Sequence, residues 1–418
     1  MEKPTVKIAD DGLTLSTLFD TVCVPWADVT GIAFADYVVT VQARDGAYTL
    51  EKLGRDAEPV YAQLLTAYCD KVRKALFVTG EAALTAKGDV DGVRGVRVEV
   101  HEGCILSLPP DLSARRVPLC FATGFSDADF QARVSVVDGT GVTYAKLGYD
   151  HAPFVKAVTD AIVKLREKTA GQIQEIDPSL SGAQTARLAK LLPEGAAAPV
   201  GALRDIAPSF VDALEARLAQ SRAAETYAAL KALCDPEQIA VGFRKQDAAA
   251  AAGGLPDGLA EAIPEGLTGG LGGGLAGAIP EGLTGGLAAL TGGAAEADAA
   301  SAPADPYALW FIAPARSGHA CAVEFAGADT EAAATFLYRF DVPWDAFRLK
   351  LNMALEAIAF KREIIRLTDE ELKAPENADY RMANDRSEAV RFVRSSFAGR
   401  AIHRGMDSWK QQLQPIMG

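Results

Sequence analysis

The first part of the chain alternates short strand-like runs with one longer helical run. Apolar or alternating segments rich in β-branched and aromatic residues predict strands at 6–9, 13–16, 22–24, 31–34, 37–43 and 48–53. From Glu58 the apolar positions recur at helical spacing, and a stripe runs through Val60, Leu64, Tyr68 and Val72. We therefore expect several antiparallel strands followed by a single helix.

This pattern occurs twice. Val24-Pro25 and Asp45-Gly46 return 93 residues later (117 − 24 and 138 − 45) as Val117-Pro118 and Asp138-Gly139. Lys52-Leu53-Gly54 returns 94 residues later (146 − 52) as Lys146-Leu147-Gly148, so one residue is inserted near Thr140-Gly141. A register kept through turns, strands and the start of the helix predicts a duplicated domain.

The pattern then changes twice more. Residues 171–235 are expected to form a helical connector, with Pro208 and Ser209 at the start of a long helix. Strand-like runs resume at 238–244, 309–313, 320–326 and 335–340, and helical spacing returns from Trp344 to Ile365. These runs predict a third, diverged copy of the strand-plus-helix unit.

The expected fold is thus α+β, with tandem small antiparallel β-sandwich or barrel units, each closed by a C-terminal helix. The expected domains are two repeats, the connector, the third unit and a basic helical tail, at 1–78, 79–170, 171–235, 236–366 and 367–418. A Gly/Leu-rich insert at 247–305 interrupts the third unit, and it contains two copies of Ala-Ile-Pro-Glu-Gly-Leu, starting at Ala262 and Ala278. It is either a flexible loop or a segment that docks on a partner or a membrane.

The duplicated part of the chain resembles a known class of domain. Val24-Pro25-Trp26, Asp36-Tyr37-Val38-Val39, Asp45-Gly46 and Lys52-Leu53-Gly54 look like bacterial pleckstrin-homology-like domains, over residues 1 to about 170. The resemblance implies a small sandwich or barrel whose open end is covered by the helix. Members that bind phosphoinositides use a basic cluster in the first hairpin loop, whereas this loop is the acidic segment Ala9-Asp10-Asp11-Gly12. This departure argues against the binding of lipid head groups.

Composition limits the possible functions. The chain of 418 residues has a net charge of −13, which argues against broad nucleic-acid binding. It has no apolar run of the roughly 18 residues that span a bilayer, and its start lacks the features of a signal peptide, so a cytoplasmic location is expected. The six cysteines form no CxxC pair, and His101 and Cys104 have no second ligand pair, so neither a metal site nor a cofactor site is predicted.

The sequence contains no GxxxxGK[ST], GxSxG or HExxH motif, and none of its four histidines adjoins a plausible nucleophile. The favoured hypothesis is a non-enzymatic, cytoplasmic scaffold that binds protein partners. Two alternatives stay open: a peripheral membrane adaptor that uses the insert and the basic tail, and an enzyme of unfamiliar type. The oligomeric state is left undetermined.

Two groups of residues are candidates for binding a partner. Trp26 and Tyr37 either line a peptide groove or belong to the core of the first repeat. Residues 381–418 hold seven basic residues against three acidic ones, and 387–402 has the spacing of a helix with one apolar and one basic face. That helix either packs on the third unit or docks on an acidic partner or membrane through Arg391, Arg394, Arg400 and Arg404.

Overall fold

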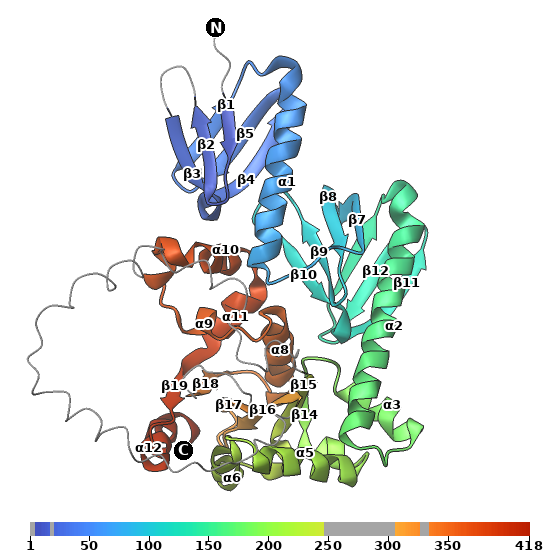
Figure 1. Cartoon of the computed structure of the whole chain (residues 1–418), viewed down its shortest axis with the longest axis vertical. Coiled ribbons are helices and arrows are strands. Elements are labelled where there is room, and N and C mark those ends of the chain that lie inside the picture. The colour runs from blue at the N-terminus through green and yellow to red at the C-terminus, as the bar shows by residue number, and fades with distance from the viewer. Residues whose placement is uncertain (1–4, 17–20, 246–305, 327–333) are drawn as a thin grey trace, which may run out of the picture. The chain divides into compact units, whose positions relative to one another are not determined.

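The computed structural model describes residues 5–16, 21–245, 306–326 and 334–418 (Figure 1). Within these ranges the fold is α+β, with eleven α-helices and four sheets. Nearly all of the described residues belong to one compact unit; of the second unit, 244–308 and 327–331, the structure describes only 244, 245 and 306–308. The expected insert at 247–305 lies outside the described residues.

The first segment contains two three-stranded sheets and one helix. Its strands are β1 (Thr5–Ile8), β2 (Gly12–Ser16), β3 (Thr21–Pro25), β4 (Val29–Ala35), β5 (Val38–Ala43) and β6 (Gly46–Leu50). The sheets have the orders β1-β2-β3 and β4-β5-β6, and every pairing is antiparallel. Helix α1 (Ala57–Ala75) follows and buries Leu64, Tyr68 and Val72, the stripe expected from the sequence.

The second segment contains one seven-stranded antiparallel sheet of order β10-β9-β8-β7-β13-β12-β11. Its strands are β7 (Leu84–Val90), β8 (Val93–Val100), β9 (Cys104–Leu108), β10 (Arg115–Pro118), β11 (Ala122–Ala128), β12 (Gln131–Val136) and β13 (Gly141–Ala145). Helix α2 (His151–Ile176) packs against this sheet and buries Phe154, Val158 and Leu165. The sequence pattern had not predicted β7, β10 or β11.

The two segments match in backbone detail. Asp36 and Tyr37 take positive φ in the turn between β4 and β5, as do Asp129 and Phe130 between β11 and β12, 93 residues later. Two consecutive positive φ values define the hairpin turn that fits the twist of its strands. Val39 pairs with Leu50, whereas Ala132 pairs with Tyr144, so the separation rises from 93 to 94 within one hairpin. The inserted residue therefore lies in the turn between β12 and β13, where the sequence had located it.

Four helices follow as the connector: α3 (Gly182–Leu191), α4 (Val200–Arg204), α5 (Pro208–Gln220) and α6 (Ala224–Leu233). Ser181 and Gln184 form a capping box at the start of α3. Pro208 opens α5, as expected, but Ser209 donates its hydroxyl to Asp177 at 2.7 Å instead of capping that helix. The single long helix expected after Pro208 is wrong, because the Ser221 hydroxyl bonds Leu218 O and Ala223 N and separates α5 from α6.

A six-stranded sheet forms the third element of the fold. Its order is β14 (Ala197–Pro199), β15 (Ala240–Lys245), β16 (Tyr307–Pro314), β17 (Ala320–Ala326), β18 (Ala334–Arg339) and β19 (Phe397–Ile402). The buried Asn352 amide holds the short strand β14 by bonds to both the N and the O of Ala197, at 3.1 and 2.9 Å. Asn352 lies on α8 (Trp344–Ala357), which follows β18.

The C-terminal part differs from the helical tail expected at 367–418. After α9 (Glu363–Arg366), it contains α10 (Ala378–Arg386), α11 (Glu388–Ser396) and α12 (Met406–Met417), but β19 interrupts the helices. The expected single helix over 387–402 is wrong beyond Ser396, because 397–402 pairs with the edge of β18. Along β19 Ala398 and Arg400 are exposed while Ala401 is buried, which is the period of a strand.

Candidate functional site

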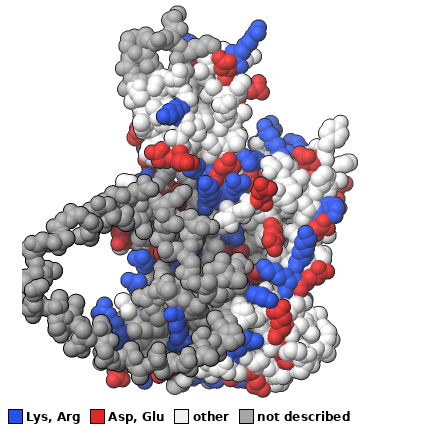
Figure 2. All heavy atoms as spheres, in the orientation of Figure 1, with Lys and Arg blue, Asp and Glu red and all other residues white. Residues whose placement is uncertain are grey.

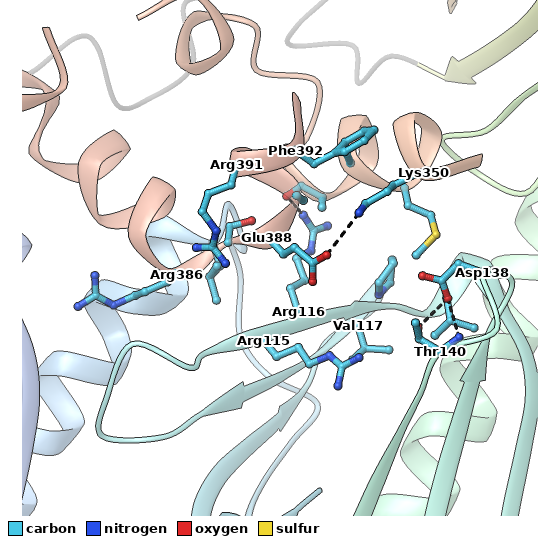
Figure 3. Close-up of a pocket in the computed structure, with 18 of the residues that line it drawn as sticks. Arg115, Arg116, Val117, Asp138, Thr140, Lys350, Arg386, Glu388, Arg391 and Phe392 are labelled. Carbon is cyan, nitrogen blue, oxygen red and sulfur yellow. Dashed lines mark hydrogen bonds and ion pairs between the residues drawn. The ribbon is translucent and has the colours of Figure 1, made fainter. Parts of the chain in front are cut away.

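A groove with a volume of about 800 Å³ lies beside helix α8 (Figure 3). One wall is formed by residues 112–118, which include β10, and by the turn between β12 and β13. The other wall is formed by one face of α8 and by residues 386–392 at the end of α10 and the start of α11. We call this site the α8 groove.

Helical spacing explains which side chains of α8 reach the groove. Ala346, Leu349, Lys350, Met353 and Ala357 recur every three or four residues and line it, while Phe347, Leu351 and Leu355 face the core. On α11, Val390 and Val393 are buried, and Arg391 and Phe392 line the groove. The groove wall is thus the outer face of helices whose inner faces are held by packing.

Two of the groove's five basic residues are used to hold the fold together. Arg116 donates to the Glu356 carboxylate at 2.7 Å, to Glu356 O at 3.2 Å and to Ala357 O, so that it ties β10 to the end of α8. Arg386 is 3% exposed and donates to Val29 O at 2.6 Å and to the Tyr68 hydroxyl at 3.2 Å. Their hydrogen bonds to carbonyls fix these two guanidinium groups.

The other three basic residues lie at the rim. Arg115 is paired with Asp91 at 3.0 Å, and both side chains are about two-fifths exposed. Arg391 is exposed, and its Nη1 donates to the carbonyls of Asn384 and Asp385, at 3.1 and 2.8 Å, in the last turn of α10. Lys350 Nζ lies 4.9 Å from the centre of the Phe392 ring and 3.5 Å from Glu388. These contacts leave three cationic side chains accessible around one concavity.

Acidic groups are fewer here, and one of them accepts hydrogen bonds within its own turn. Asp138 accepts hydrogen bonds from the amide and the hydroxyl of Thr140, at 2.9 and 2.6 Å, within its own turn (Figure 3). Glu388 lies in the first turn of α11, where a carboxylate interacts favourably with the helix dipole, and its side chain is 80% exposed. Five basic and two acidic residues line the groove, so its local charge is opposite to that of the whole chain.

The structure separates the four arginines that were expected to act together. Only Arg391 lines the α8 groove. Arg394 donates to Ile364 O at 2.9 Å, to Leu367 O and to Asp369 at 2.7 Å, and thereby anchors α11 to the segment that begins with α9. Arg400 is exposed on β19, and Arg404 is exposed in the turn that follows. The expectation of one basic helical face is wrong, because the helix ends before Arg400.

The two aromatic candidates, Trp26 and Tyr37, differ in exposure to solvent. Trp26 is 2% exposed, and its indole N–H donates to Ala9 O at 2.9 Å, so it belongs to the core. Tyr37 is 71% exposed at the tip of the hairpin between β4 and β5. Its counterpart Phe130 is 83% exposed at the matching tip.

Sequence reasoning missed Arg115, Lys350 and Phe392. The sequence did contain a signal for Arg115. Arg115 and Arg116 stand 93 residues after Val22 and Cys23, so the second segment carries two arginines where the first has small apolar residues. No such signal exists for Lys350 or Phe392. They come from segments far away in the sequence, and only the fold brings them to the same groove as β10.

Buried thiols and one buried threonine hydroxyl are possible nucleophiles. Burial raises the pKa of the Cys69 thiol to about 12 and those of Cys104 and Cys234 to about 11, which disfavours the reactive thiolate. Thr335, His403 and Glu324 lie together, but His403 Nε2 faces both other side chains, at 3.0 and 3.2 Å. A hydrolytic triad uses the two ring nitrogens separately, and Thr335 is fully buried under the Trp409 N–H, so this network is structural.

Among the described residues, no cluster of three or more His, Cys, Asp or Glu side chains could hold a metal ion. Within the same ranges, every helix is too short or too polar to cross a bilayer. The sequence matches no protein-family model and shows no significant similarity to a curated protein.

Proposed function

We propose that this chain is a non-enzymatic adaptor that binds protein partners and whose first two units are tandem pleckstrin-homology-like repeats. In each unit a set of antiparallel strands would form a small sandwich or barrel closed by the helix that follows, α1 or α2. The matched turns with positive φ, the matched positions of the two helices and their buried apolar stripes support this view.

The α8 groove carries the functional part of the proposal. It combines apolar side chains with three accessible cations whose neighbours hold them at the rim, and mixed polar and apolar lining is typical of sites that recognise polypeptide segments. The charged side chains visible in Figure 2 mix basic and acidic ones without an extended patch of one sign. That distribution favours a local binding site over the broad cationic surface that nucleic acids require.

The membrane alternative loses one of its two supports, because the amphipathic helix expected at 387–402 ends at Ser396. Its other support, the insert, lies outside the described residues. Flotation of the purified protein with anionic liposomes provides the comparison: salt-sensitive recovery with liposomes would favour that alternative.

The proposal is tested with the purified full chain as bait. We expect at least one protein from the source cell to be retained reproducibly and then to bind the isolated chain directly, in a defined stoichiometry, by calorimetry. The adaptor function would be contradicted if no protein bound the chain directly. It would also be contradicted if a retained protein no longer bound once it had been purified.

A further inference from the structure

The chemistry of the α8 groove indicates which kind of polypeptide it accepts, if it is the binding site of the proposed adaptor. We infer that the groove binds an acidic segment of a partner protein that also carries large apolar side chains. The acidic groups would meet Arg115, Lys350 and Arg391, and the apolar ones would pack on Leu349, Met353 and Phe392.

Charge complementarity is the first argument. The three rim cations come from β10, α8 and α11, so they surround the groove instead of following one helix. The groove is lined by five basic residues against two acidic ones, Asp138 and Glu388, which are both exposed. Because complementary charges steer encounter and set specificity, an acidic ligand is favoured over a neutral or basic one.

Glu388 indicates where a ligand carboxylate would lie. It is 3.5 Å from Lys350, at the limit of a hydrogen bond, and both side chains are more than half exposed. Such an exposed pair contributes little free energy, so it is readily exchanged for another. A partner carboxylate can therefore take the place of Glu388 beside Lys350 (Figure 3).

The apolar wall distinguishes a polypeptide from other anions. Leu349, Met353 and Phe392 are half-buried, and the Lys350 ammonium lies over the Phe392 ring. A side chain that covers this wall would also shield the cation from water and strengthen its charge interactions. A flat bilayer would reach the rim but not the concave wall, and a free phosphate would use only the cations.

An unbiased selection tests the inference. A displayed library of random 12-residue peptides is selected on the wild-type chain and on the Arg115→Gln/Lys350→Gln/Arg391→Gln variant. We expect wild type alone to enrich peptides that combine Asp or Glu with Leu, Ile or Phe. Enrichment of basic peptides, of acidic peptides without apolar residues, or of the same peptides by both chains would overturn the inference, as would the absence of enrichment.

The most enriched peptide is then synthesised and its affinity measured by fluorescence anisotropy. The triple variant should bind at least tenfold more weakly and Leu349→Ser several-fold more weakly, whereas Glu388→Gln should bind about twofold to fivefold more tightly because the competing carboxylate is gone. Lys156→Gln, on the exposed side of α2 and outside the groove, is the matched control and should leave binding unchanged. Equal binding by wild type and the triple variant would contradict the inference.

Two further variants separate the possible failures. Arg115→Lys/Lys350→Arg/Arg391→Lys keeps the charge, so it should retain most of the affinity, and unfolding curves of every variant should match wild type. If a natural partner binds wild type and the triple variant equally, the adaptor function stands and the groove inference is wrong. If the chain binds no protein directly, the adaptor function itself is wrong.

Discussion

The two matching segments of the chain share a backbone frame but differ in what their surfaces contact. Both contain the same hairpin turns with positive φ, the same 3₁₀ turn before the helix and the same position of helix start. In the first segment Pro110 O accepts a hydrogen bond from Ile32 N at 2.8 Å, so β4 is covered by the loop between β9 and β10. The matching position in the second segment, Phe125, is half-exposed on the edge strand β11.

Some positions of this frame hold similar residues in both segments, and others do not. The two positions with positive φ at each hairpin tip are occupied by similar residues, Asp36-Tyr37 and Asp129-Phe130, and Asp is among the residues enriched at positive φ. Residues of β3 differ more from their counterparts in β10: half-buried Val22 corresponds to Arg115, and exposed Cys23 corresponds to Arg116, which is tied to Glu356. The α8 groove lies beside the second segment, at β10, where these changes are found.

The largest expected difference between the segments is in their helices. Phe154 of α2 is fully buried against the Tyr144 ring, whereas its counterpart 94 residues earlier, Val60 of α1, is half-buried. Phe154→Ala should lower the free energy of unfolding by about 3–5 kcal/mol and Val60→Ala by about 1 kcal/mol. Urea unfolding curves measure both. Equal losses would mean that the two helices are buried alike at these positions, and would contradict the difference described here between α1 and α2.

The next effect concerns Arg116 and its counterpart Cys23. Arg116→Met leaves the Glu356 carboxylate and two carbonyls without this donor and should cost about 2–4 kcal/mol, because both partners are mostly buried. Cys23 is exposed on β3, so Cys23→Ser should change the stability by less than about 0.5 kcal/mol. A double-mutant cycle with Glu356→Gln should show a coupling of about 1 kcal/mol or more. Additive losses would argue that the ion pair does not join β10 to α8.

A smaller effect, confined to acid, is expected from Glu99 of β8. Burial alone would raise its pKa, but the hydrogen bond from His101 and the charges of Arg97 and Arg73 outweigh burial, and its pKa lies below the usual 4.5. A carboxyl with a lowered pKa stabilises the fold above its unfolded pKa, and this contribution is lost as the pH falls through the folded value.

Stability should therefore decline as the pH is lowered below about 4.5, and Glu99→Gln should weaken that decline while it lowers the stability at neutral pH. In the first hairpin of the first segment, Lys7 pairs with Thr14, and in the matching hairpin of the second segment Glu99 pairs with Leu106. The exposed Lys7 therefore occupies the position that matches Glu99. Lys7→Gln is thus the control and should leave the acid profile unchanged. Thermal unfolding at a series of pH values measures both profiles.

The local pattern of apolar and polar residues predicted those elements that bury one face along their length. The stripes of α1 and α2 and the apolar strands β16, β17 and β18 were found, because each buries enough of one face to leave a periodic signal. Strand β10 was missed because Arg115-Arg116 interrupts its apolar pattern, and β11 because its outer residues are exposed. Strands β14 and β19 depend on distant partners, Asn352 and β18, which no local window contains.

The site was less predictable than the fold for the same reason. Helical spacing identified Arg391 correctly as a surface cation, but it also grouped Arg391 with Arg400, which lies on a strand. The contact between Lys350 and Phe392 joins two helices that are separated by a turn-rich segment, so no spacing rule relates them. Charge balance pointed to residues 381–418, and of the four arginines expected there to bind a partner only Arg391 lines the α8 groove.

The smallest expected effect is at the two hairpin tips, where the segments are most alike. Tyr37 and Phe130 are exposed and take positive φ, a conformation that glycine adopts without strain. Tyr37→Gly and Phe130→Gly should each change the free energy of unfolding by less than about 1 kcal/mol, because relief of backbone strain offsets the greater freedom of the unfolded chain. The centres of the Phe130 and His151 rings lie 6.0 Å apart, whereas the residue that matches His151 in the first segment is Ala57. Phe130→Gly should therefore be the less favourable of the two by a few tenths of a kcal/mol. In a His151→Ala background, which also lacks the bond to Asp127, Phe130→Gly should no longer show that difference. A loss of several kcal/mol at either tip would show that its side chain is packed against the protein, and that the two hairpins are not the equivalent exposed turns of a duplicated frame.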